Sequence, residues 1–108
     1  MISRIGAALL FLSLTGCSET TTFEIRNDSH NPIMDVTVWK SGTPTMFGEF
    51  EPGEARTIEF RAVFENSYRL TYEQNGQKFH KDLCYQAWGY KANGTISIRS
   101  DGLQLKCQ

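Results

Sequence analysis

The chain has 108 residues, 40% of them apolar, and its 11 basic and 12 acidic side chains leave a formal net charge of −1. This length suits one small domain rather than two. The basic side chains form no block or stripe, which argues against nucleic acid as a partner.

The N-terminus combines a single positive charge with a short apolar run. Arg4 provides the charge and residues 5–14 provide the run. The run is well short of the roughly 20 apolar residues that a membrane-spanning helix needs, so it reads as a secretory signal. It closes on Leu-Thr-Gly-Cys at residues 14–17. This motif resembles the lipobox of bacterial lipoproteins and matches it at every position.

The resemblance implies that residues 1–16 are a cleaved lipoprotein signal peptide and that Cys17 carries a diacylglyceryl group, often with another acyl chain on the new N-terminus. Each buried methylene contributes about 0.8 kcal/mol, so two or three chains anchor a protein stably to a lipid bilayer. Ser18 stands where an acidic residue would favour the inner membrane, which implies an outer-membrane address in a Gram-negative source. Residues 17–22 would then be the lipidated N-terminus and a short tether, and residues 23–108 the domain.

From residue 22 onward, short segments alternate apolar and polar residues, a period of two that predicts half-buried β-strands. Residues 46–50 offer one further short strand. In chain order, the apolar residues that alternate with polar ones are Phe23 and Ile25; Met34, Val36 and Val38; Ile58 and Phe60; Tyr68, Leu70 and Tyr72; and Ile96 and Ile98, which are expected to face inward. A last segment contains Leu103, Leu105 and Cys107.

Turn-forming residues separate these segments at 27–32, 41–44, 51–54 and 100–102. The pair Asn75-Gly76 predicts a tight hairpin, because a type I′ turn needs two residues that tolerate positive φ. The sequence therefore predicts an all-β fold with seven or eight strands, either a small antiparallel β-sandwich of immunoglobulin-like architecture or a small barrel. The cysteine and tryptophan spacing of true immunoglobulin domains is missing.

Two cysteines remain in the domain, Cys84 and Cys107. An exported protein reaches an oxidising compartment, so we expect these two to form a disulfide. In the chain-entropy model such a bridge contributes roughly 3 kcal/mol. The alternative, a redox-active or metal-binding pair, lacks the Cys-x-x-Cys spacing.

The sequence contains little that suggests catalysis or metal binding. His30 lies in a polar turn, whereas His80, Asp82 and Cys84 would share one face of an extended strand and could form half of a zinc site. Lys78 shares that face, which favours a solvated surface instead. A catalytic triad is recognised by geometry rather than by order, but no nucleophile elbow or phosphate-binding loop is present. We expect no enzyme activity, no metal and no cofactor.

Aromatic residues give the better indication of function. Trp39 lies on the polar face of its predicted strand, and Tyr85, Trp88 and Tyr90 crowd one loop beside Cys84. Rigid aromatic side chains on a pinned loop provide a large contact area at low entropic cost, as at binding hot spots. The alternative is that the two tryptophans cover the core of a small sandwich.

Together these observations predict a lipoprotein anchored in the outer membrane and facing the periplasm. Its non-enzymatic domain would bind another envelope component, most simply a protein, through loops or a sheet edge. One alternative is an inhibitor or immunity protein that blocks a periplasmic hydrolase or toxin. Another is a structural adaptor subunit of a secretion or envelope assembly.

Overall fold

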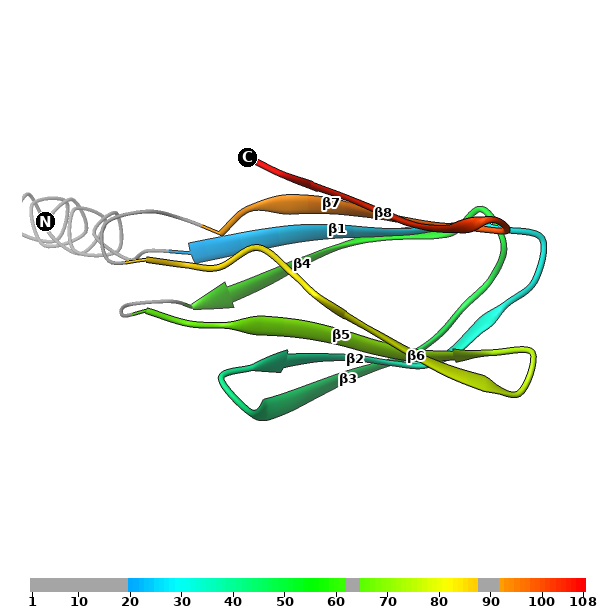
Figure 1. Ribbon diagram of the computed structural model, residues 1–108, viewed down its shortest axis with the longest axis horizontal. Coiled ribbons are helices and arrows are strands. Elements are labelled where there is room, and N and C mark those ends of the chain that lie inside the picture. Colours follow the sequence, from blue (N-terminus) through cyan, green and yellow to red (C-terminus); the bar gives the residue numbers. More distant parts are fainter. Residues whose placement is uncertain (1–19, 62–64, 88–91) are drawn as a thin grey trace, which may run out of the picture.

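The structure is a computed structural model that describes residues 20–61, 65–87 and 92–108. In these residues the chain forms two four-stranded sheets packed face to face (Figure 1), so the predicted all-β sandwich is confirmed. No helix among them could cross a membrane. The strands are β1 (Thr20–Asp28), β2 (Ile33–Lys40), β3 (Thr43–Phe50), β4 (Ala55–Arg61), β5 (Tyr68–Gln74), β6 (Gln77–Asp82), β7 (Gly94–Arg99) and β8 (Gly102–Cys107).

Sheet A has the strand order β4-β1-β7-β8, and sheet B has the order β3-β2-β5-β6. In immunoglobulin constant domains the first strand pairs with the second, whereas here β1 pairs with β4 and β7. The β1–β7 pair is parallel, while the other described strand pairs are antiparallel. Its two strands lie far apart in the sequence, and an alternation of side chains carries no information about such a pairing.

The core lies between the two inner faces. Phe23, Phe60 and Tyr68 form an aromatic cluster within it, with ring centroids 5.0 Å apart for Phe23 and Tyr68 and 5.7 Å apart for Phe60 and Tyr68. Such pairs contribute about 1 kcal/mol each beyond the area they bury. The buried apolar residues are Phe23, Ile25, Ile33, Val36, Val38, Phe50, Ile58, Phe60, Tyr68, Leu70, Tyr72, Leu83, Cys84, Ala92, Ile96 and Ile98. Leu103 and Leu105 pack against this core only in part.

The alternation predicted for the second strand is wrong at Met34. Met34 is 41% exposed, and Ile33 is buried in its place. The cause is a β-bulge: the register of β2 shifts between Ile33 and Val36, and Asp35 adopts a φ of 51°. One extra residue in a strand moves the preceding side chains to the opposite face.

Tight turns join the hairpins of sheet B. Asn75 and Gly76 have φ values of 54° and 76°, so the predicted hairpin is confirmed. Ser41 and Gly42, with φ values of 47° and 87°, form a second such turn between β2 and β3. The predicted break over residues 41–44 is therefore too long, because β3 already begins at Thr43.

Asn27 was predicted to begin a turn but is a fully buried residue of β1. Its side-chain amide donates to the backbone oxygens of Asn31 and Phe50, at 2.9 and 3.1 Å, and its side-chain oxygen accepts from the Ser29 hydroxyl at 2.6 Å. Because both the NH₂ group and the oxygen of this buried amide have hydrogen-bond partners, its loss of contact with water is compensated. Asn27 therefore fixes the loop that leads from sheet A to sheet B.

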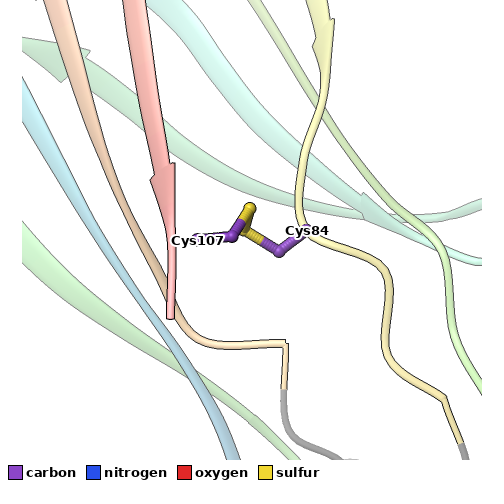
Figure 2. Close-up of a disulfide and its surroundings, with 2 residues drawn as sticks. All are labelled: Cys84 and Cys107. Atoms are coloured by element: carbon purple, nitrogen blue, oxygen red, sulfur yellow. A yellow bond between two sulfur atoms is a disulfide. The ribbon is translucent and has the colours of Figure 1, made fainter.

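The predicted disulfide between Cys84 and Cys107 is confirmed, with Cα atoms 5.7 Å apart. Cys84 lies on the segment that follows β6 and crosses from sheet B toward sheet A (Figure 1), and Cys107 ends β8 (Figure 2). Gly94 packs against this bridge, because a Cβ at that position would lie 2.7 Å from Cys84 Sγ. The bridge therefore staples the crossover segment to the edge strand of sheet A.

Candidate functional site

A hollow of about 650 Å³ lies on the outer face of sheet B, where β2 ends and β6 leaves the sheet. Its lining includes Trp39, Arg69, Thr71, Asp82, Leu83 and Tyr85. The structure thus brings together two of the four aromatic residues predicted to bind a partner, Trp39 and Tyr85. The other two, Trp88 and Tyr90, lie outside the described residues, as does Cys17.

Trp39 takes its place through the pairing of three strands. It lies opposite Arg69 of β5, which in turn lies opposite Asp82 of β6, so the three form one row across the sheet. The indole is half-buried on the outer face, and its Nε1 donates to Thr71 Oγ1 at 2.9 Å. Trp39 is therefore not part of the core, and the hydrogen bond fixes the orientation of its ring.

Tyr85 directly follows the disulfide-bonded Cys84 on the segment after β6, and it is 59% exposed. Its hydroxyl donates to Glu65 Oε2 at 3.0 Å, and this carboxylate raises the pKa of Tyr85 above its usual value. The Tyr85 ring is thus exposed, and its hydroxyl is already hydrogen-bonded to Glu65.

The residues on either side of Tyr85 are anchored to the body of the domain. Cys84 is bound in the disulfide, and Gln86 exchanges two backbone hydrogen bonds of 3.0 Å with Asn66. The Gln86 side chain is buried, and its oxygen accepts from the Tyr68 hydroxyl at 3.1 Å. These contacts connect the backbone on both sides of Tyr85 to the body of the domain.

Arg69 and Asp82 supply the charges of the hollow. Arg69 Nε donates to Asp82 Oδ1 at 2.7 Å, and this hydrogen bond holds the pKa of Asp82 below its usual value. The two side chains are 54% and 74% exposed. An ion pair this exposed contributes little to stability, but it offers a partner both a donor and an acceptor.

A second hollow of about 340 Å³ adjoins the first along the same strands, and Thr71 lines both. Thr37, Thr71 and His80 form the next row across the sheet, and Lys78 and Phe79 lie at the edge. The outer face of sheet B therefore has two adjoining hollows near the edge strand β6.

His80, Asp82 and Cys84, the residues of the possible zinc half-site, do not share one face. His80 and Asp82 are exposed on β6, whereas Cys84 is buried and bound in the disulfide. Within residues 20–61, 65–87 and 92–108, no three His, Cys, Asp or Glu side chains lie close enough to hold a metal ion. His30 is exposed in the loop after β1.

Sequence reasoning did not single out Arg69 or Thr71 as site residues, and it considered Asp82 only for half of a zinc site. Arg69 and Thr71 alternate with the inward-facing Tyr68 and Leu70 along the same strand. The sequence pattern alone therefore predicts that Arg69 and Thr71 face outward. Their position beside Trp39 depends on the β2–β5 register, which no local pattern specifies.

No known protein family and no curated protein match the sequence. Among solved structures, the fold is similar to the NMR structure of a protein from Eubacterium rectale, with 20% identity over 82% of this chain and 88% of that one, at a TM-score of 0.49. It is also similar to a structure of a disulfide-locked mutant of Intermedilysin with human CD59, with 9% identity over 84% of this chain and 24% of that one, at a TM-score of 0.45. Neither similarity assigns a role to any residue of this chain.

Proposed function

We propose that this protein is a lipoprotein anchored in the outer membrane through Cys17, and that its domain binds another envelope protein through the hollow on sheet B. The observation that carries the binding proposal is the joint position of Trp39 and Tyr85 on the rim of one hollow. The domain acts by binding and not by catalysis.

The size and lining of the hollow support this proposal. Ligand sites usually enclose 300–1,000 Å³ and combine an apolar wall with a few placed polar groups. Here two aromatic rings supply the apolar wall, while Arg69 and Asp82 supply the polar groups. Because Thr71 holds the indole and the disulfide holds the backbone next to Tyr85, a partner meets side chains that lose little entropy on binding. A protruding apolar side chain flanked by charge is the group that such a hollow accepts.

The binding test is a capture experiment in which the tagged full chain, solubilised from the envelope, is incubated with envelope extract. Tyr85→Ala is the main variant, because Tyr85 is exposed and its loss leaves the core intact. We expect its affinity for the captured protein to fall about 30-fold, the effect of a 2 kcal/mol hot spot. The affinity of Trp39→Ala should fall by at least the same factor.

Arg26→Ala, on the outer face of sheet A, is the matched control and should bind like the wild type. Equal affinity of all three variants would refute the role of the hollow. If the captured protein is a hydrolase or toxin that the wild-type domain inactivates, the function is inhibition.

The anchor is tested separately from binding. Cys17→Ala should move the protein from the membrane fraction to the soluble fraction, and mass spectrometry of the native product should show a chain that begins at Cys17 and carries added acyl mass. An unmodified Cys17 in the native product would refute the anchor and leave the binding proposal in place.

A further inference from the structure

Strand β6 is an open edge of sheet B. It ends the strand order of that sheet, and each of its six residues is exposed. It pairs with β5 without a break from Arg69–Asp82 to Gln74–Gln77. The opposite edge, β3, contains Pro44 and a register shift near Gly48, two features that keep an edge from pairing with another strand. Strand β6 has neither.

The backbone groups that β6 offers to a new strand can be identified. Leu83 N donates to Tyr68 O at 2.8 Å, so the odd-numbered residues of this segment direct their N–H and C=O groups toward β5. In an antiparallel ladder these directions alternate. Lys78, His80 and Asp82 therefore direct their N–H and C=O groups away from the sheet, and their side chains share its outer face.

We propose that β6 pairs antiparallel with β6 of a second copy of this chain, about a two-fold axis that passes through His80. In this register Lys78 lies opposite Asp82 of the second copy, and Asp82 lies opposite its Lys78. All three residues with outward backbone groups find a partner, which gives about six backbone hydrogen bonds. The two Lys–Asp pairs place opposite charges directly across from each other, which favours pairing.

Other symmetric registers are poorer. A shift by one pair in either direction leaves only two of the three outward-facing residues of β6 with backbone partners, and both Lys–Asp pairs are lost. A further shift places Lys78 opposite Lys78, or Asp82 opposite Asp82, and like charges directly opposite destabilise a pairing. Charge and hydrogen bonding thus select the same register.

The inner side of β6 fits the same arrangement. Phe79 is 40% exposed and stacks on Tyr72 with ring centroids 5.2 Å apart. In the proposed register Phe79 lies opposite Lys81 of the second copy, whose aliphatic stem can cover the ring and whose ammonium group is attracted to its face.

The pairing also extends the hollow. Asp82 lines the 650 Å³ hollow, so Lys78 of the second copy would join its rim. A six-residue edge buries less area than a standard protein interface, and we therefore expect a monomer–dimer equilibrium that depends on concentration.

Cysteine cross-linking of the full chain in detergent micelles tests the register. With His80→Cys, the two introduced thiols lie on the two-fold axis with Cα atoms about 5.5 Å apart, within the range that a disulfide spans. We expect a covalent dimer on non-reducing gels after mild oxidation. Lys78→Cys is the matched control, because residues 78 of the two copies would lie more than about 12 Å apart. Equal cross-linking of the two variants would overturn the register.

Charge exchange tests the pairing itself, measured by sedimentation equilibrium of the full chain in micelles. Lys78→Glu and Asp82→Lys each turn two attractive pairs into repulsive ones, so each should weaken the dimer about tenfold. The double variant should recover the wild-type constant within about threefold, because opposite charges again face each other.

Lys106→Glu, on the edge strand of sheet A, carries the same charge change as Lys78→Glu and should leave the dimer unchanged. A chain that stays monomeric at every concentration would leave β6 free for a strand of a different protein and would overturn the proposal. That result would not affect the test of Tyr85, which reports on the hollow alone.

Discussion

The outer faces of the two sheets differ in chemistry. That of sheet A carries charged and hydroxyl side chains, among them Glu24, Arg26, Asp28, Thr57, Glu59, Thr95, Ser97 and Arg99. That of sheet B also carries charged side chains, such as Arg69, Lys78 and Asp82. It adds Trp39, Met34 and Met46, and the two methionines are 41% and 81% exposed. Trp39 lines the 650 Å³ hollow, and exposed apolar side chains on one face are a feature of interaction surfaces. The proposed binding surface therefore lies on sheet B and not on sheet A.

The two sheets also differ in regularity. The described pairings of sheet A keep an unbroken register, and β1 is paired on both sides. In sheet B the register of β2 shifts around Asp35, against both of its neighbours. Bulges of this kind occur often beside functional sites, where they redirect side chains.

Removal of the disulfide should have the largest effect on stability, and the effect should differ between the two sheets. In Cys84→Ser with Cys107→Ser, the free energy of unfolding should fall by about 3 kcal/mol. The bridge ties down the end of β8, so amide hydrogen exchange should accelerate more in β7 and β8 than in β2 and β5. Denaturant titration and exchange mass spectrometry measure the two effects. Equal acceleration in both sheets would show that the bridge stabilises the whole fold evenly.

Substitution of one glycine in each sheet compares their tolerance to added volume. In Gly94→Ala the new Cβ would meet Cys84 Sγ at 2.7 Å and the Lys106 carbonyl oxygen at 3.1 Å. These neighbours are held by the disulfide and the β7–β8 pairing, so we expect a loss of about 2–3 kcal/mol.

Gly48→Ala is the counterpart in sheet B. No atom lies within 4 Å of the new Cβ, and only the positive φ of 77° opposes the change. We expect a loss of about 1 kcal/mol. Thermal and denaturant unfolding of both variants measure the difference, and equal losses would contradict the contrast between the sheets.

The smallest effect concerns the charge in the hollow. Because Arg69 lowers the pKa of Asp82, the folded state favours the ionised carboxylate. Its stabilising contribution is therefore present above the pKa that aspartate has in the unfolded chain, and it is lost as the pH falls through the lowered value, below about pH 4. NMR titration should place the midpoint of Asp82 below that of an ordinary aspartate.

Arg69→Ala should move the Asp82 midpoint upward. Glu54 serves as the internal reference, because its pKa is lowered by a different arginine, Arg56. An Asp82 midpoint that does not respond to Arg69→Ala would show that the ion pair does not form in solution.

Sequence alone sufficed for the local features of the fold. The alternation of Phe23 with Ile25 and of Ile96 with Ile98 reports directly which side chains are buried, and Asn75-Gly76 can hardly form anything but a tight turn. The disulfide was predicted from the count of cysteines and the expected export signal.

What the sequence could not provide depends on contacts between distant strands. The bulge at Asp35 moved Met34 outward, although an aspartate between apolar residues looks like ordinary alternation. Asn27 is buried because its side chain joins the loop after β1 to the end of β3. The hollow exists because β2, β5 and β6 align Trp39, Arg69 and Asp82. These features arise from register, which is a property of pairs of strands.

The position of β1 has one further consequence. Only two residues lie between Cys17 and Thr20, where β1 begins. Lipid on Cys17 would therefore hold that end of sheet A within about 11 Å of the bilayer, the length of three extended residue steps. In two copies joined through β6, the β1 strands would run in opposite directions. Both lipid tethers could then enter one bilayer only if the strands of the dimer lay parallel to the membrane surface. Since stacked sheets are about 10 Å apart, tethers this short would require sheet A to face the lipid. The hollows of both copies would then open toward the aqueous compartment.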